Sequence, residues 1–369
     1  MIASGGTGGH VYPALAIADA LRRRAGEREL KLLLVGTRAG VERHLFQEVP
    51  WPTAFISARP LPRRLSARTV ASAAAIALGF LQAWRLLRRF RPSLAIGTGG
   101  YASVCTIYTA SLLGIKTLIH EMDAIPGRAN RFLARRATAV TVGFPSAAPA
   151  LRRADARHTG NPVRSEFANP DRAAARKHFA LNPDLPTLLV FGGSQGALSI
   201  NRAVLGAIVP LARDLRLQVV HVTGPDKHAE IADAHRALPD DVRRRYHPLP
   251  YLRGTVHLAL AAADIVLSRA GAAFLAELTA VGRPAILVPY PYSMAAHQQA
   301  NAEQLARAGA ALVLDDAQLR PRKIVALLGE LLADRQRLER MAQASRALGN
   351  IAAADHIAEI AWELMHRPP

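Results

Sequence analysis

Three short glycine-rich stretches in this 369-residue sequence could hold an anion: GGTGGH at 5–10, GTGGY at 97–101 and GGSQG at 192–196. Glycine lets the backbone approach a ligand closely, and a helix that starts there offers free N–H groups and the positive end of its dipole. Each stretch stands between an apolar run and a helical pattern, so each is expected to join a strand to a helix. A plain turn is the alternative for any one of them, but three at strand ends favour phosphate binding.

His10 directly follows the first of these turns and is expected in the first turn of its helix. The helix N-terminus disfavours positive charge and therefore favours a neutral imidazole. A neutral histidine beside a bound phosphate is a candidate general base. A capping or packing histidine is the alternative, and the adjacent glycines favour the catalytic interpretation.

Two charged residues are candidate nucleotide ligands. Glu277 lies six residues after Gly271 on a predicted helix, where a carboxylate can accept hydrogen bonds from both hydroxyls of a ribose; a solvated helix glutamate is the equal alternative. Arg164 follows a rigid Asn-Pro in GNPVR, where a cation can meet a diphosphate or form a linker salt bridge.

The familiar nucleotide-binding motifs do not fit the glycine turns. No G-x-x-x-x-G-K-[ST] string occurs, so no P-loop is predicted. The G-x-G-x-x-G fingerprint fails at Val11, and Thr37 and Arg38 stand where an acidic residue for a ribose is expected. These failures argue against ATP or NAD bound in either of these ways.

Short apolar runs alternate with helical patterns along the chain, which is typical of parallel sheets covered by helices on both faces. The runs lie at 30–36, 94–100, 116–121, 137–144, 187–196, 217–224, 263–271 and 284–290. The pattern restarts after Pro162, so we predict an α/β chain with two doubly wound domains, 1–161 and 162–345, and a helix at 346–369 that packs back on the first. The predicted site is the cleft between the domains, beyond the carboxyl ends of the strands. Only four residues precede the first glycine turn, so the first strand is expected to be short, or the natural start lies upstream.

The chain is strongly basic, with 47 Lys and Arg against 28 Asp and Glu and a net charge of +19. This balance indicates an anionic partner such as a membrane surface or a phosphorylated substrate, although an arginine-rich genome gives the same excess. No basic stripe with interleaved aromatic residues occurs, which argues against nucleic acid. The single cysteine, Cys105, excludes disulfides and a cysteine metal site, and no signal peptide or membrane-spanning run is visible.

The segment 61–91 is a candidate membrane-surface helix, with an apolar face framed by arginines. The residues of this predicted face and its flanks are Ile76, Phe80, Trp84 and Leu87, with Arg63, Arg64, Arg85, Arg88 and Arg89. A core-packing helix with solvated arginines is the equal alternative.

Seven strings, in order from about residue 4 to about residue 365, resemble the MurG family of bacterial peptidoglycan synthesis. They are GGTGGHVYPALAIADAL, GTGGYAS, HEMDAIPGRANRFLA, GNPVR, FGGSQGALSIN, SRAGAAFLAEL and HQQANAEQLARAGAA. Any one string is weakly specific, but seven in order are a strong signal.

The resemblance implies a GT-B fold, in which two Rossmann-like domains flank a deep cleft. The first would serve the acceptor and the membrane, and the second would bind UDP-N-acetylglucosamine (UDP-GlcNAc). It implies an inverting transferase that moves N-acetylglucosamine to the C4 hydroxyl of the N-acetylmuramoyl unit of lipid I, an undecaprenyl diphosphate, giving lipid II. It further implies no metal or cofactor, a peripheral place on the cytoplasmic face of the inner membrane, and other cell-wall synthesis proteins as candidate partners.

The resemblance also assigns site residues, with His10 as the catalytic base, Glu277 on the ribose and the backbone near Leu252 on the uracil. The donor-binding residues that it implies are Thr7, Gly8, Gly9, Asp123, Arg164, Ser194, Leu252, Ala272, Ala273, Phe274, Leu275, Ala276, Glu277 and Gln298. The acceptor-binding residues that it implies are Gly99, Gly100, Tyr101, His120 and Glu121.

Departures from the family pattern leave open a degenerate homologue, which stands beside a second alternative. The family's HEQN reads HEMD here, so Asp123 brings a negative charge where an asparagine would contact the donor sugar. The usual SGA reads AGA at 270–272, the segment before Glu277 is bulkier, and an acidic pair before Gln298 is absent. The alternatives are another GT-B glycosyltransferase and a degenerate nucleotide-sugar-binding homologue with weak activity.

Overall fold

The computed structural model describes residues 1–38, 40, 42–47, 49–59, 67–293 and 296–366. The chain divides into two units: unit 1 is Met1–Arg164 with the segment from Asn350 onward, and unit 2 is Ser165–Gly349. The first domain therefore ends three residues after 161, and the segment that returns to it begins at 350 rather than at 346.

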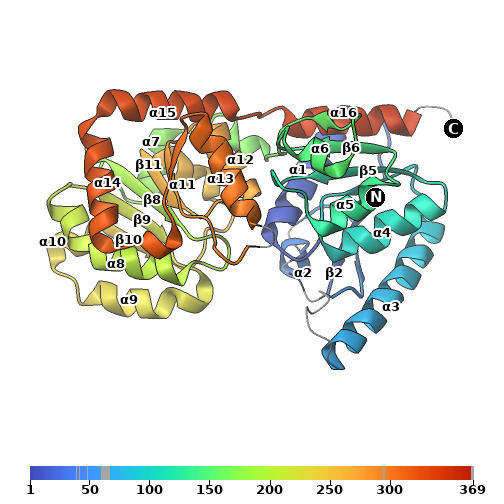
Figure 1. Ribbon diagram of the computed structural model, residues 1–369, viewed down its shortest axis with the longest axis horizontal. Helices are drawn as coiled ribbons and strands as arrows, with labels where there is room; N and C mark the ends of the chain where they lie inside the picture. Colours follow the sequence, from blue (N-terminus) through green and yellow to red (C-terminus); the bar gives the residue numbers. More distant parts are fainter. Residues whose placement is uncertain (39, 41, 48, 60–66, 294–295, 367–369) are drawn as a thin grey trace. The chain divides into compact units, whose positions relative to one another are not determined.

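Unit 1, in which Figure 1 labels β2, β5 and β6, is built on a seven-stranded parallel sheet. The strand order is β3-β2-β1-β4-β5-β6-β7. Its strands are β1 (Ile2–Ala3), β2 (Leu34–Thr37), β3 (Thr53–Ile56), β4 (Leu94–Gly97), β5 (Lys116–Glu121), β6 (Ala139–Val142) and β7 (Arg157–His158). Its helices are α1 (Gly8–Ala25), α2 (Glu42–Leu45), α3 (Ala67–Phe90), α4 (Gly100–Leu112), α5 (Arg128–Ala134), α6 (Ala147–Leu151) and α16 (Ala353–His366).

The two faces of this sheet carry separate apolar cores, because successive side chains of a strand point to opposite faces. Leu118 of β5 packs with α1 and α16, whereas its neighbour Ile119 packs with α3, α4, α5 and α6. Burial on both faces explains why the strands are continuous apolar runs rather than alternating patterns. The C-terminal helix α16 lies along α1, with ion pairs from Arg23 to Asp355 at 2.8 Å and from Arg24 to Glu359 at 3.1 Å.

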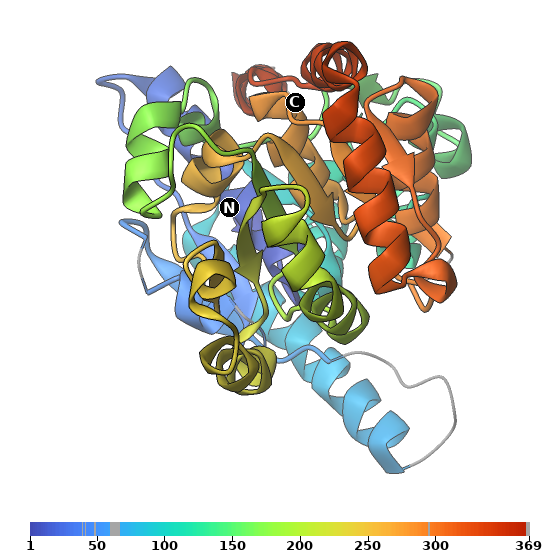
Figure 2. The same ribbon diagram turned by 90° about the vertical axis from the view of Figure 1, so that its left-hand side faces the viewer.

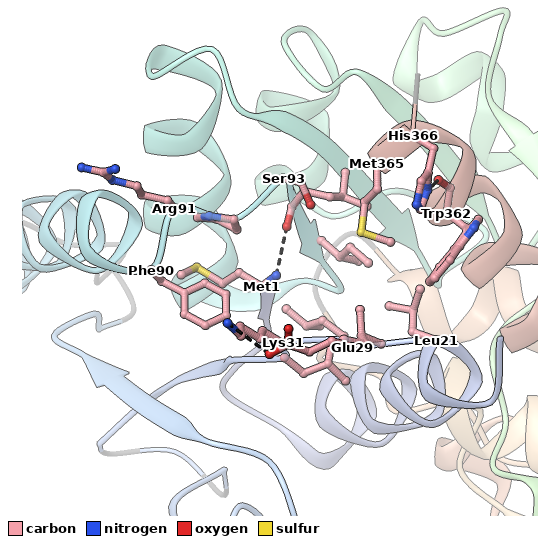
Figure 3. A pocket seen from close by; sticks show the side chains of 16 residues that line it. Met1, Leu21, Glu29, Lys31, Phe90, Arg91, Ser93, Trp362, Met365 and His366 are labelled. Carbon is pink, nitrogen blue, oxygen red and sulfur yellow. Dashed lines mark hydrogen bonds and ion pairs between the residues drawn. The ribbon is translucent and has the colours of Figure 1, made fainter. Parts of the chain in front are cut away.

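The first strand is short, as predicted: β1 has two residues and lies between β2 and β4. At its amino end a pocket of about 350 Å³ opens between the start of β4, the loop before β2 and α16 (Figure 3). Leu32, Phe90, Trp362 and Met365 are among the side chains that line it. Ligands of parallel sheets bind at the carboxyl ends of the strands, so this pocket lies at the opposite edge from the glycine turns.

Unit 2 is built on a six-stranded parallel sheet in the order β10-β9-β8-β11-β12-β13. Its strands are β8 (Thr187–Phe191), β9 (Gln218–Val222), β10 (Tyr246–Leu249), β11 (Ile265–Ser268), β12 (Ala285–Leu287) and β13 (Ala311–Val313). Its helices, which lie on both faces of the sheet (Figures 1 and 2), are α7 (Arg172–His178), α8 (Leu198–Arg213), α9 (His228–Arg236), α10 (Asp240–Arg243), α11 (Val256–Ala262), α12 (Ala272–Val281), α13 (His297–Arg307), α14 (Pro321–Ala333) and α15 (Arg335–Leu348).

The prediction of an α/β chain with two doubly wound parallel sheets is thus confirmed. Among the described residues, no helix combines the length and the apolar character that crossing a bilayer requires.

Candidate functional site

Each sheet reverses its strand order at one point, and the glycine turns flank these points. In unit 1 the reversal lies between β1 and β4, and in unit 2 it lies between β8 and β11. The turns at 5–10 and 97–101 follow β1 and β4, while 192–196 and 269–272 follow β8 and β11. Crevices at such reversal points are where doubly wound sheets bind their ligands, so each unit offers one candidate site.

The two turns of unit 1 are packed against each other through glycine. Gly99 and Gly100 have φ angles of +113° and +80°, which favour glycine. A Cβ on Gly99 would lie 2.7 Å from the His10 ring, and one on Gly100 would overlap the carbonyl of Gly5. The Thr98 hydroxyl also donates to the His10 carbonyl at 2.9 Å. Side chains at 99 and 100 would therefore push the first turn away.

Helix α1 begins in the first glycine turn without a side-chain cap. Thr7 is its N-cap residue in an extended conformation, and the Thr7 side chain makes no capping hydrogen bond. No acidic residue stands in the first turn of the helix, which starts at Gly8. This helix start is therefore suited to an anion, which the N–H groups and the helix dipole favour.

The His10 imidazole is held in one orientation by the turn that precedes it. Its Nδ1 atom lies 3.0 Å from the carbonyl oxygen of Gly5 and 3.5 Å from the Thr7 hydroxyl. A carbonyl oxygen only accepts hydrogen bonds, so Nδ1 carries a proton, and in the neutral ring the lone pair is on Nε2. The half-buried His10 thus presents the atom that a general base needs.

In unit 2, the start of α12 is the counterpart of this arrangement. Gly271 is its N-cap residue and supplies no side chain to the first-turn N–H groups. Ala273, Ala276 and Glu277 are half-buried on the accessible side of the helix. The glycine turn after β8 approaches the Thr223 carbonyl through Gly196, where a side chain would clash.

Two glycosyltransferase domain models match most of the chain. The glycosyltransferase family 28 N-terminal domain matches residues 1–142, and the family 28 C-terminal domain matches residues 187–359. The UDP-N-acetylglucosamine–N-acetylmuramyl-(pentapeptide) pyrophosphoryl-undecaprenol N-acetylglucosamine transferase of Halothermothrix orenii is 40% identical over 350 residues, covering 94% of this chain and 93% of the relative. The crystal structure of Acinetobacter baumannii MurG is 27% identical with a TM-score of 0.73, covering 98% of each chain.

The chain belongs to the MurG family. Its fold is GT-B, as the resemblance implied. CalG4, the calicheamicin glycosyltransferase, has a TM-score of 0.68 at 18% identity, covering 100% of this chain and 98% of its own, and shares the fold alone.

Two predicted acceptor residues of the MurG-type motif HEMD, His120 and Glu121, have buried side chains. His120 is fully buried; its Nε2 donates to Asn161 Oδ1 at 3.0 Å, and its Nδ1 lies 3.0 Å from the Thr141 hydroxyl. Burial lowers the pKa of His120 to about 4, so the ring is neutral. Asn161 in turn donates to the Met122 carbonyl at 2.9 Å. The His120 side chain therefore anchors the GNPVR segment, and its role at the acceptor stays a prediction.

Glu121 is likewise buried and holds the loop that follows β5. Its Oε1 accepts from the Asp123 N–H at 2.9 Å, and its Oε2 accepts from the Gly127 N–H and the Asn130 amide, each at 3.0 Å. Burial, together with the charge of Asp123, raises the pKa of Glu121 to about 7. The three hydrogen-bond donors lower the pKa, but by less than these two effects raise it. Both oxygens accept hydrogen bonds within unit 1, so Glu121 positions the half-buried Asp123, and its role at the acceptor stays a prediction.

Two large side chains among the predicted donor residues on α12 are also buried, as is the methyl group of Ala272. Phe274 is 6% exposed and stacks on Phe191, the last residue of β8, at 4.2 Å between ring centroids and 14° between planes. Leu275 is buried in the core. These two residues can offer a ligand only backbone atoms, whereas Glu277 can offer its carboxylate.

Gln298, at the start of α13, has its amide oxygen engaged within unit 2. Its Oε1 accepts from the Tyr290 N–H at 3.0 Å and from the Ala270 N–H at 3.3 Å. The side chain therefore closes the loop after β12 onto the end of β11.

The donor-binding roles of Arg164, Ser194 and Leu252 remain predictions. The Arg164 guanidinium lies 5.0 Å from the ring of Tyr12 on α1, so it is held within unit 1. Ser194 is half-buried in the turn after β8. Leu252 buries its side chain in the loop after β10, which leaves its backbone for the uracil contact that the family implies.

Two residues that support these turns were missed in the sequence. Arg269 directly follows β11, bonds the carbonyls of Val288 and Pro289, and pairs with Asp316 at 2.7 Å. Glu42 is buried against the first glycine turn. Both could have been found from the sequence. Arg269 is a charged residue directly after an apolar strand, and Glu42 is an acidic residue soon after the second strand.

Proposed function

We propose that the chain transfers N-acetylglucosamine from UDP-GlcNAc to the lipid-linked N-acetylmuramoyl-pentapeptide diphosphate, lipid I, to give lipid II. Family membership over the whole chain supports this activity, since the relatives are named for it. The observation that carries the mechanism is the fixed His10 imidazole, with Nδ1 bonded to Gly5 and Nε2 available.

In the proposed reaction, His10 Nε2 takes the proton of the acceptor C4 hydroxyl. The hydroxyl oxygen forms a bond to C1 of the sugar as the bond from C1 to the diphosphate breaks. The configuration at C1 inverts, and the electron pair of the broken bond leaves with UDP. Helix N-termini and Arg164 stabilise that negative charge, so the reaction is proposed to need no metal.

The donor is proposed to bind at the reversal point of unit 2. The starts of α8 and α12 are suited to the diphosphate because neither has a side-chain cap or an acidic first turn. Glu277 would accept from the ribose hydroxyls, the Leu252 backbone would contact the uracil, and Gln298 Nε2 would donate to the sugar. Ser194 would contact the donor from its turn.

The acceptor is proposed to bind over the second glycine turn, at Gly99, Gly100 and Tyr101. His120 and Glu121 serve this site indirectly, because they fix the segments around Asn161 and Asp123.

We also propose that unit 1 attaches to the cytoplasmic face of the cell membrane. The predicted apolar face of α3 needs correction: Leu87 is 1% exposed, and Ile76 and Phe80 pack on the core. Arg63 and Arg64 lie outside the described residues. On α3, α4 and α5 the exposed large apolar side chains are Leu78, Leu81, Trp84, Leu112 and Phe132. The exposed Arg85, Arg88 and Arg89 flank those of α3. Apolar side chains among arginines suit an anionic bilayer surface.

The test is transfer of labelled N-acetylglucosamine from UDP-GlcNAc to a lipid I analogue in detergent or vesicles. A disaccharide-linked product is expected, with the same rate after treatment with EDTA. Binding of UDP-GlcNAc without any product would overturn the proposal in favour of a degenerate homologue. A rate that EDTA abolishes and Mg²⁺ restores would overturn the metal-free mechanism.

A further inference from the structure

Glu42, the first residue of α2, is a buried acidic residue in contact with the first glycine turn. It is 0% exposed. Its Oε1 atom accepts hydrogen bonds from the Gly6 N–H at 3.0 Å, the Thr37 N–H at 3.0 Å and the Thr37 hydroxyl at 2.7 Å. A carboxyl group is costly to bury, and here three donors converge on one of its oxygens.

The bond to Gly6 reaches the histidine through a single peptide group. The N–H of Gly6 and the carbonyl of Gly5 belong to the same planar peptide. That carbonyl is the group that lies 3.0 Å from His10 Nδ1. The order of contacts is therefore Glu42 Oε1, the Gly5–Gly6 peptide and His10 Nδ1, with Nε2 at the far end of the ring.

Glycines enclose the Glu42 side chain, so any side chain at Gly5 or Gly36 would displace it. A Cβ on Gly5 would lie 2.7 Å from Glu42 Oε1, and one on Gly36 would lie 2.6 Å from its Cγ. Within the described part of the chain, the second oxygen, Oε2, is buried with no hydrogen-bond partner. A buried carboxyl oxygen without a hydrogen-bond partner lowers the stability of the fold. A functional role therefore explains Glu42 better than stability alone.

We propose that Glu42 is a positioning residue for His10, acting through the Gly5–Gly6 peptide. The inference rests on the proposed role of His10 as the base. Glu42 fixes the plane of the peptide, and the peptide carbonyl fixes the ring and its tautomer. The bond to the Gly6 N–H also polarises the Gly5 carbonyl, which strengthens its bond to Nδ1–H. The arrangement resembles an acid–histidine pair with one peptide inserted between the partners.

Three variants distinguish the positioning of His10 by Glu42 from a purely structural role. Glu42→Gln keeps an acceptor oxygen, Glu42→Ala removes it, and Glu42→Asp draws it back from the Gly6 N–H by one methylene. Thr37→Val is the matched control, because it removes a hydrogen bond to the same oxygen without changing the contact with the Gly5–Gly6 peptide.

The first readout is the side-chain ¹⁵N NMR spectrum of histidine-labelled protein, with the His10 signals identified by their loss in His10→Asn. Wild type, Glu42→Gln and Thr37→Val are expected to show the Nδ1–H tautomer. Glu42→Ala and Glu42→Asp are expected to show a mixture of tautomers. An Nε2–H tautomer in wild type, or an unchanged tautomer in both Glu42→Ala and Glu42→Asp, would overturn the proposal.

The second readout is the split between kcat and KM in the transfer assay. Glu42→Ala and Glu42→Asp are expected to lower kcat about tenfold or more, with KM for UDP-GlcNAc within about threefold. Glu42→Gln and Thr37→Val are expected to keep kcat within about threefold of wild type. If Glu42→Ala does not fold, Glu42→Asp decides: wild-type kcat in a folded Glu42→Asp would refute the proposal. If wild type makes no product, the proposed function fails, while the tautomer spectrum still tests the contact.

Discussion

The Nδ1 atom of His10 lies 3.0 Å from the carbonyl oxygen of Gly5, in the same glycine turn. Because the carbonyl can only accept, this contact assigns the proton to Nδ1 and leaves Nε2 as the basic nitrogen. The turn therefore holds the ring of the proposed base and also offers a helix start to an anion. Gly99 completes the arrangement, since a side chain there would strike the ring.

Replacing His10 with alanine is expected to lower kcat for transfer by about 10²- to 10⁴-fold, the usual contribution of a general base. KM for UDP-GlcNAc is expected to stay within about threefold, because the donor is proposed to bind mainly in unit 2. The measurement is steady-state transfer to a lipid I analogue. His356→Ala, an exposed histidine on α16, is the matched control and should keep full activity. Turnover of His10→Ala within a few fold of wild type would refute the assignment of the base.

Asp123→Asn is expected to tighten UDP-GlcNAc binding by about three- to tenfold, which corresponds to roughly 1 kcal/mol. The substitution removes a negative charge from the vicinity of an anionic ligand and supplies an amide donor. The main-chain bond from residue 123 to Glu121 is kept, because it uses the backbone N–H. Calorimetric titration with UDP-GlcNAc measures the change. An unchanged dissociation constant would mean that Asp123 does not contact the donor.

The fold and the glycine turns could be predicted because their signals are local. A buried parallel strand is a continuous apolar run, and the turn after it needs glycine wherever φ is positive, as at Gly99 and Gly100. His10 was recognisable by its place beside such a turn. Short edge strands such as β7 and β13 were not predicted, since two or three residues carry too little pattern.

The side-chain environments could not be predicted, because they depend on contacts between distant segments. His120 meets Asn161, 41 residues away, and Glu42 meets Gly6, 36 residues away. Helix α3 shows the same limit. Its sequence is apolar on more than one side, so periodicity alone did not reveal that Leu87 faces the core while Leu81 faces outward.

Glu121 is expected to make stability fall as pH rises. Its pKa is raised from 4.5 to about 7, so the folded state holds a proton that the unfolded state releases between these values. The contribution of Glu121 to stability is therefore complete below about pH 4.5 and is lost as pH rises through 7. Between pH 5 and pH 8 wild type is expected to lose about 2 kcal/mol more than Glu121→Gln, which cannot ionise.

Urea unfolding of the two proteins at both pH values measures this difference. Asp123→Asn is the companion variant, and it should reduce the loss because the Asp123 charge is one cause of the raised pKa. Identical pH dependence in wild type and Glu121→Gln would show that Glu121 ionises normally in the folded protein.

Charged substitutions on the exposed side of α3 are expected to weaken membrane attachment. Leu81 and Trp84 are 44% and 41% exposed, and the Arg88 guanidinium lies 5.4 Å from the Trp84 ring. Leu81→Glu combined with Trp84→Glu should reduce binding to vesicles containing anionic lipid by about tenfold or more, because apolar burial is lost and negative charge is added. Sedimentation with vesicles measures the effect, and transfer to a water-soluble acceptor analogue should be unchanged. Leu348→Glu on α15, where Leu348 is 43% exposed, is the matched control. Equal loss of binding in that control would mean that added charge alone, and not this side of α3, decides attachment.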